Sequence, residues 1–196
     1  EQLGAGFFIT HVLGSATTSG ELRDLEVGDV DGDGDLDVVT SAFFETTALG
    51  PPALYRNDDF VFTKELIVPE PWNASSVEFA DVDGDGDLDL VATTFRDVSG
   101  GRNGIRRDLV WMENDGTGVF TPHTIGNGAR VVGNAEAIDF DRDGDVDILT
   151  TESGFGGIVW YENDGHQAFT RHRITAVRPG TEFSTHAMYV HAADAD

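Results

Sequence analysis

The chain has 196 residues, with 36 Asp or Glu against 12 Lys or Arg, and its formal net charge is −24. Nucleic acid and membrane insertion are not expected, because the first requires a basic face and the second about 20 consecutive apolar residues. The 24 glycines and the absence of cysteine suit a turn-rich all-β protein without disulfides.

The first predicted element is FFITHVLG, an apolar and β-branched strand within segment 1–22. Four further strands follow in segment 23–68, and we name them A to D: LEVG, DVVTSAFF, ALYR and FTKELIV. Strands A and B are joined by DVDGDGDLD (29–37), which carries aspartate at every second position. Strands C and D are joined by a tight turn. The segment is predicted to form one antiparallel four-stranded unit.

The unit recurs twice, in segments 75–126 and 133–175, with matching loops DVDGDGDLD (81–89) and DFDRDGDVD (139–147). Strand C now reads LVWMENDG or IVWYENDG, and Asn-Asp-Gly is a strong hairpin signal. A repeat of four short strands about every 55 residues is typical of a β-propeller blade. Segment 187–196, YVHAADAD, resembles a further strand A.

The whole chain, 1–196, is therefore predicted to be all-β, with three complete four-stranded antiparallel propeller blades. Segment 1–22 would supply strand D of a preceding blade, and segment 187–196 strand A of a further one. Propellers close with about four to eight blades, so we expect these three to belong to a larger ring. The other blades would come from the same chain or from other copies, and an unusually small closed propeller is the remaining alternative.

The aspartate loops predict about three cation sites. Five carboxylates in nine residues repel one another unless a hard cation lies between them, and Ca²⁺ accepts six to eight oxygen ligands. Side chains at positions 1, 3 and 5 can converge, a glycine at position 6 allows a sharp turn, position 7 offers its carbonyl and position 9 closes the shell. The candidate ligands are Asp29, Asp31, Asp33, Asp35 and Asp37, then Asp81, Asp83, Asp85, Asp87 and Asp89, then Asp139, Asp141, Asp143, Asp145 and Asp147.

The loops have two alternative interpretations, an EF-hand and a metal-free acidic turn. An EF-hand needs a Glu at position 12 and flanking helices, but position 12 is Thr40, Ala92 or Thr150 and the flanks are strand-like. Solvated acidic turns without metal do not explain three matching copies.

The aspartate loop followed by W-x-E-N-D-G closely resembles the FG-GAP/VCBS repeat family, which includes blades like those of integrin α-subunits. The resemblance implies a calcium-stabilised propeller, usually extracellular, and implies that the aspartates above bind the metal. The third loop departs from the pattern because Arg142 replaces glycine at position 4.

Three further positions recur and are interpreted as structural. One on strand D suggests a repeated hydrogen bond (His11, His123, His172, with Glu65 in the remaining copy). One on strand C suggests packing between blades (Trp111, Trp160, with Tyr55 in the first blade). The glutamates of strand A suggest side-chain hydrogen bonds rather than a channel lining (Glu26, Glu78, Glu136).

Ligand binding is expected in the irregular loops between the strands. Trp72 could stack on a sugar ring, and Arg102, Arg106 and Arg107 could hold an anionic group. The predicted function is an extracellular or cell-surface module, with the periplasm as an alternative, that binds a glycan or protein.

The alternative is a carbohydrate-active enzyme such as a polysaccharide lyase, which needs a His or Tyr base beside a cation. Arg107, His186, Tyr189 and His191 supply these residue types.

Overall fold

The computed structural model describes residues 13, 20–44, 52–67, 73–97, 105–126, 131–152, 157–174 and 190–192. These residues form three antiparallel four-stranded sheets, each in the order of the chain. The first sheet holds β1 (Gly20–Gly28), β2 (Asp37–Phe44), β3 (Ala53–Asp58) and β4 (Val61–Leu66). The second holds β5 (Asn73–Ala80), β6 (Asp89–Asp97), β7 (Ile105–Asn114) and β8 (Phe120–Gly126). The third holds β9 (Val131–Ile138), β10 (Asp147–Glu152), β11 (Gly157–Asn163) and β12 (Phe169–Arg173).

The predicted all-β class and the three four-stranded blades are confirmed. The first strands of the blades begin a few residues before the predicted starts of the units. The extra residues precede a register shift, between Leu22 and Asp24 in β1 and between Ala74 and Ser76 in β5, so the strand continues through an irregularity that local sequence does not reveal. The part of the chain that the structure describes has no helix that could cross a membrane.

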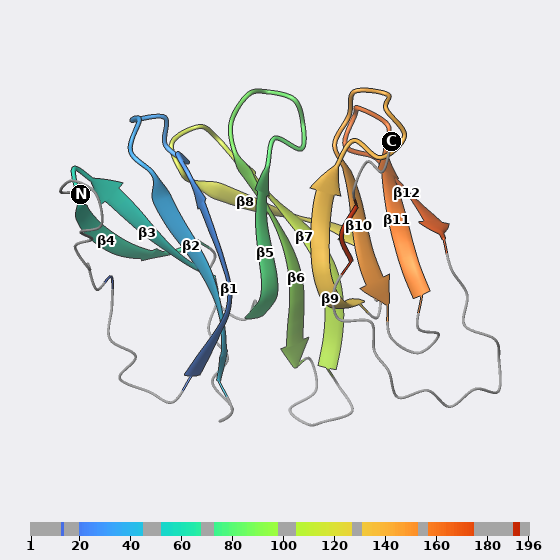
Figure 1. Cartoon of the computed structure of the whole chain (residues 1–196), viewed down its shortest axis with the longest axis horizontal. Coiled ribbons are helices and arrows are strands. Elements are labelled where there is room, and N and C mark those ends of the chain that lie inside the picture. The colour runs from blue at the N-terminus through green and yellow to red at the C-terminus, as the bar shows by residue number, and fades with distance from the viewer. Residues whose placement is uncertain are drawn as a thin grey trace, which may run out of the picture.

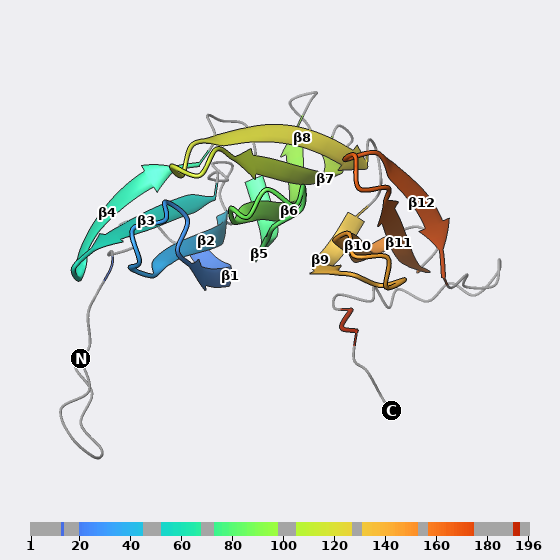
Figure 2. The same ribbon diagram turned by 90° about the horizontal axis from the view of Figure 1, so that it is seen from above.

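The three blades follow one another along an arc (Figure 2). Strands β1, β5 and β9 lie on its inner side and β4, β8 and β12 on its outer side. All three loops between the first and second strands lie at the same edge of the blades, the top in Figure 1. Closure of the arc into a ring stays a prediction.

Apolar side chains fill the space between neighbouring blades. Side chains alternate between the two faces of a strand, so β6 sends Leu90 and Ala92 into the core shared with the first blade and Val91 into the core shared with the third. These three side chains are completely buried. The middle blade is thus covered on both faces, and the nearly continuous apolar sequence of its central strands suits this burial.

Glutamates on the inner strands connect successive blades. The Ala137 amide of β9 donates to Glu78 Oε1 of β5 over 3.1 Å, and the Ala192 amide donates to both carboxylate oxygens of Glu136 over 3.0 and 2.9 Å. Burial, together with the negative charge of Glu136, raises the pKa of Glu78 to about 7. The interpretation of these glutamates as hydrogen-bonding groups is confirmed for Glu78 and Glu136.

Trp111 is 2% exposed and lies in the core between the second and third blades, as predicted. The predicted equivalence of Tyr55 with this tryptophan is wrong by one residue. Trp111 pairs with His123 on the neighbouring strand, whereas Leu54, not Tyr55, pairs with Glu65. The aromatic side chain of Tyr55 therefore lies on the opposite face of its blade.

Candidate metal centres

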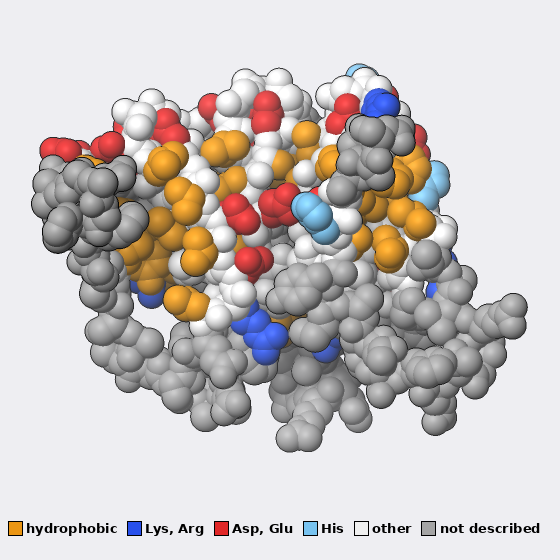
Figure 3. Space-filling view, in the orientation of Figure 1, with side chains coloured by type: hydrophobic (Ala, Val, Ile, Leu, Met, Phe, Trp, Pro, Cys, Tyr) orange, Lys and Arg blue, Asp and Glu red, His pale blue; other side chains and the backbone are white. Residues whose placement is uncertain are grey.

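The three aspartate loops each bring a set of carboxylates together at the same edge of the blades (Figures 1 and 3). In each set, one oxygen from each of three aspartates lies within 4.8 Å of the others. The sets are Asp29, Asp31 and Asp33, then Asp81, Asp83 and Asp85, then Asp139, Asp141 and Asp147. The structure thus brings together side chains from nine of the fifteen predicted ligands.

Glycine at position 6 allows each loop to turn. Gly34, Gly86 and Gly144 have φ angles of 94°, 98° and 101°, in the left-handed region where a side chain is strained. Each glycine amide donates to the position-1 aspartate, over 3.0, 3.1 and 3.2 Å respectively. This contact holds the first carboxylate over the turn. Arg142 takes φ 67° at position 4 of the third loop, so this departure from the pattern adds backbone strain.

The first loop contains two buried carboxylate oxygens that a bound cation would satisfy. Asp29 Oδ1 and Asp31 Oδ1 are hidden from solvent and have no hydrogen-bond donor. A buried carboxylate oxygen without a partner is costly, and a bound cation removes that cost. Because all the candidate side-chain donors are oxygens, they suit a hard cation such as Ca²⁺.

The second loop shows the electrostatic cost of bringing the carboxylates together. Partial burial raises the pKa of Asp83, and the neighbouring charges of Asp85, Glu113 and Asp81 raise it further. A divalent cation would reverse this effect, because an opposite charge within a few ångströms favours the ionised form.

The position-9 aspartates have a second role that sequence alone did not reveal. Asp37, Asp89 and Asp147 are completely buried, and each carboxylate accepts two backbone N–H groups. One N–H belongs to position 2 of the same loop, over 3.0–3.1 Å. The other, over 2.8 Å, belongs to the asparagine at the end of the third strand of the blade. Burial raises the pKa of Asp89 to about 6. These aspartates therefore attach the loop to its blade, whether or not they also bind metal.

The position-7 aspartates point toward the turn between the third and fourth strands. Asp35 Oδ2 accepts the Asp59 amide over 2.8 Å. In the second blade, Gly116 has a φ of 77° and a Cβ added to it would lie 2.4 Å from Asp87 Oδ2, so glycine suits this approach. The side chain is thus engaged with the turn, and metal binding by the backbone carbonyl of position 7 stays a prediction.

The asparagine of the Asn-Asp-Gly motif was interpreted only as a turn residue, but it connects the loops of adjacent blades. Asn114 Nδ2 donates to Leu88 O over 3.0 Å and to Val30 O, in the first loop, over 2.8 Å. Asn163 repeats the arrangement with Val146 O and Val82 O, over 3.2 and 3.0 Å. The recurrence of this asparagine in every blade was the signal that could have identified it.

The predicted side-chain contact is present for His123 and His172, whereas His11 lies outside the described residues. His123 Nε2 lies 2.7 Å from Glu113 Oε2, and its ring stacks on Trp111 at a centroid distance of 4.7 Å. His172 makes the same contacts with Glu162 and Trp160. Each histidine therefore covers a tryptophan and pairs with the glutamate that lies two residues after that tryptophan in the chain.

The predicted ligand-binding residues are only partly described. Trp72 and Arg102 lie outside the described residues, as do His186 and Tyr189. Arg106 lies on β7, opposite Arg96 in the sheet register. Arg107 is half-buried on the same strand. The imidazole of His191 is 84% exposed and lies 3.1 Å from Glu136.

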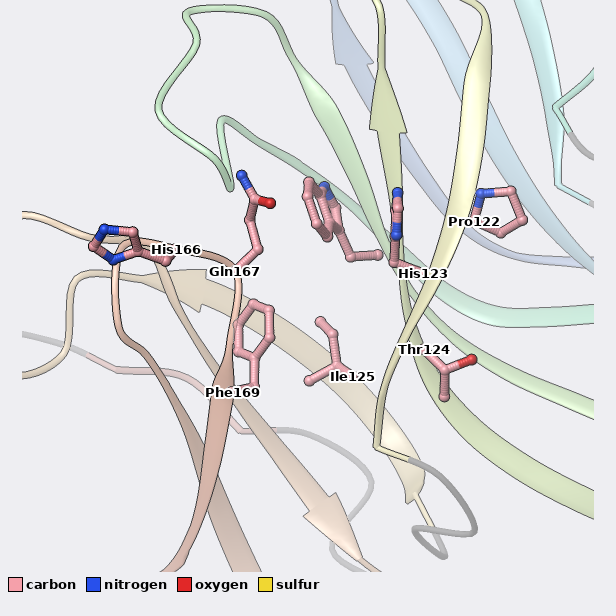
Figure 4. A pocket seen from close by; sticks show the side chains of 8 residues that line it. Pro122, His123, Thr124, Ile125, His166, Gln167 and Phe169 are labelled. Atoms are coloured by element: carbon pink, nitrogen blue, oxygen red, sulfur yellow. The ribbon is translucent and has the colours of Figure 1, made fainter.

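A cavity of about 490 Å³ lies between the second and third blades (Figure 4). The second blade lines it with Trp111, His123 and Ile125, and the third with His166, Gln167 and Phe169. Figure 4 shows Gln167 and Phe169 facing His123 and Ile125 across it. Gln167 has φ 62°, at the position that Gly118 occupies, with φ 76°, in the second blade.

Two comparisons with known proteins bear on this arrangement. A search of curated proteins found no match. A model of the FG-GAP-like repeat matches residues 42–92 and 97–150, which is more than half of the chain. Each matched segment begins in or at the end of the second strand of one blade and ends in the second strand of the next, so it includes one complete aspartate loop. The chain therefore belongs to the FG-GAP-like repeat family.

Proposed function

We propose that the chain is an extracellular, calcium-stabilised β-propeller module that binds a glycan or protein. The observation that carries the proposal is the convergence of three aspartates in each of three equivalent loops. The buried, unpartnered oxygens of Asp29 and Asp31 support occupancy by a cation. The oxygen-only donor sets support calcium rather than a softer metal.

Calcium would act on the fold. The loops join the first two strands of each blade, and their last aspartate also anchors the third strand through a backbone N–H. An ion that binds only the folded loop adds its binding free energy to the stability of the blade. The same arrangement leaves the ligand-binding role to other surfaces.

The calcium part is tested by thermal unfolding of the chain after metal removal, verified by elemental analysis. The melting temperature should fall in chelator and return when Ca²⁺ is added in excess. A D83N/D85N double variant, which removes two charges from the second loop, should show a smaller response to calcium. An unchanged melting temperature after verified metal removal contradicts the proposal.

The cavity between the second and third blades supports the binding part. Its lining combines aromatic and aliphatic surface with imidazole and amide groups, a mixture suited to a small amphipathic ring such as a sugar residue. Gln167 occupies a left-handed position where the second blade has glycine, so its amide is placed at the cavity at a cost in backbone strain.

The binding part is tested by screening neutral and acidic glycans and extracellular matrix proteins against the wild-type chain and a Q167G variant. Q167G relieves the strain and should keep or raise the melting temperature, while binding to a captured ligand weakens at least about tenfold. Equal binding by both proteins contradicts the assignment of the cavity. Release of unsaturated uronate products in the same screen would favour the lyase alternative.

A further inference from the structure

Arg56 on β3 makes three contacts around the first aspartate loop. Its Nη1 lies 2.6 Å from Asp31 Oδ2, and its Nε lies 3.1 Å from Glu65 Oε2 on the neighbouring strand. Its Nη2 donates to Thr117 O of the second blade over 2.9 Å. The side chain is 21% exposed, so it is held in place on three sides.

The other two blades carry the opposite charge at this position. The residue before the recurrent asparagine of the third strand is Arg56 in the first blade, but Glu113 in the second and Glu162 in the third. Glu113 and Glu162 each pair with a histidine instead. Glu113 thus occupies, in the second blade, the strand position from which Arg56 reaches the aspartate loop of the first blade. The first blade therefore has a cation at this position and the second blade an anion.

Asp31 divides its two oxygens between Arg56 and the loop interior. Oδ2 accepts from the guanidinium, whereas Oδ1 is buried without a donor and belongs to the oxygens that would face an ion. Arg56 thus leaves the first loop able to bind a cation but places a positive charge beside it. The same charge offsets the repulsion among the aspartates when no ion is bound.

We infer that Arg56 is a built-in counter-ion that makes the first loop a weaker calcium site than the second, and less dependent on calcium for its shape. This inference rests on the proposed binding of calcium by the loops. Replacing an anion by a cation near a divalent ion changes the product of the two charges from −2 to +2. After screening by water and salt, the expected difference in calcium affinity is at least about tenfold.

Arg56 also contacts the second blade. A Cβ on Gly118 would lie 2.3 Å from Arg56 Nη2, so a side chain there would displace the guanidinium. At the corresponding positions the second blade has Glu113 and the third has Gln167 instead of glycine, and Gln167 lines the cavity described above. The counter-ion of the first loop is therefore also a contact between blades.

The test is a calorimetric calcium titration of the complete chain as wild type, R56E, E113R and K64E. Lys64 lies on β4 of the same blade, beside Tyr55 and away from the loop contacts, so K64E makes the same change in net charge elsewhere. Wild type should show sites that differ by at least about tenfold in calcium affinity. R56E should tighten one weak site by about tenfold, E113R should weaken one tight site, and K64E should change neither.

Melting in chelator gives a second measurement that does not need calcium to bind. R56E should melt at a lower temperature than K64E, and E113R at a temperature equal to or above wild type. Three equal sites in the wild type, or R56E and K64E behaving alike, overturn the inference. If neither the wild type nor any variant binds calcium, both the proposed calcium binding and the ranking of the sites are wrong. The role of Arg56 as a counter-ion is then decided by the order of the melting temperatures in chelator. Should R56E not fold, E113R and an R56Q variant provide the same comparison.

Discussion

Replacing Asn114 by alanine tests whether the recurrent asparagine of the third strand connects the blades. The side chain is 1% exposed. It donates to Val30 O and Leu88 O and accepts the Gly118 amide over 2.9 Å. N114A removes these three hydrogen bonds, while the bond from its backbone amide to Asp89 remains possible. At about 1 kcal/mol for each bond, and more where a buried partner is left unsatisfied, the expected loss in free energy of unfolding is about 3–5 kcal/mol.

The matched control is N57A in the first blade. Asn57 is also buried, but its side chain makes two hydrogen bonds, both within its own blade: it donates to Leu36 O and accepts the Phe60 amide. Its expected loss is about 2 kcal/mol. Both variants are measured by urea unfolding in saturating calcium, with the slope checked against wild type. A loss below about 1 kcal/mol for N114A, or equal losses for the two variants, would refute the assigned role.

Two further predictions concern the inner strands and the turns. The pKa of Glu78 is raised to about 7, so its contribution to stability is present below about pH 4.5 and is lost as the pH rises through 7. E78Q keeps an acceptor for the Ala137 amide but carries no charge. At pH 8 it should therefore be about 1–2 kcal/mol more stable than wild type, after allowing for solvent screening. The difference should vanish near pH 4, and a difference that stays constant with pH would contradict this reasoning. G116A places a methyl group against Asp87 at a φ of 77° and should cost about 1–3 kcal/mol by thermal unfolding, whereas a neutral result would show that the turn can move away from the loop.

The blades and their loops could be predicted because the relevant information is local and repeated. Each aspartate loop marks the junction of two strands, and three copies confirm one another. The contacts between copies could not be predicted in this way. Asn114 and Val30 are 84 residues apart, and the motif that contains the asparagine already has a local explanation as a turn.

The misplaced Tyr55 shows a second limit of the sequence. Alignment by aromatic character placed it with Trp111, whereas alignment by the asparagine that ends the strand places Leu54 there, as the sheet register does. The asparagine is the better reference because its hydrogen bonds require one position, while an apolar core position accepts leucine or tryptophan.

The candidate ligand site could not be predicted for a related reason. The cavity is lined by residues of two blades, such as His123 on β8 and Gln167 in the turn of the third blade. Neither residue is informative alone, since each suits an exposed strand or turn. Only the packing of one blade against the next brings the two together.

Two groups of acidic residues in this chain should respond to different perturbations. Those of the loops lie at one edge of the blades, where a cation would satisfy them, whereas Glu78 and Glu136 lie on the inner strands and accept backbone N–H groups from Ala137 of β9 and from Ala192. Chelation should therefore destabilise the loop edge, while a rise in pH through 7 should weaken the contact of β5 with β9. E78Q should remove the second response and leave the first intact, because its carboxylate is not part of any aspartate set. If E78Q also suppressed the response to calcium, the two groups would have to be coupled through the blade, and treating the loops as independent sites would be wrong.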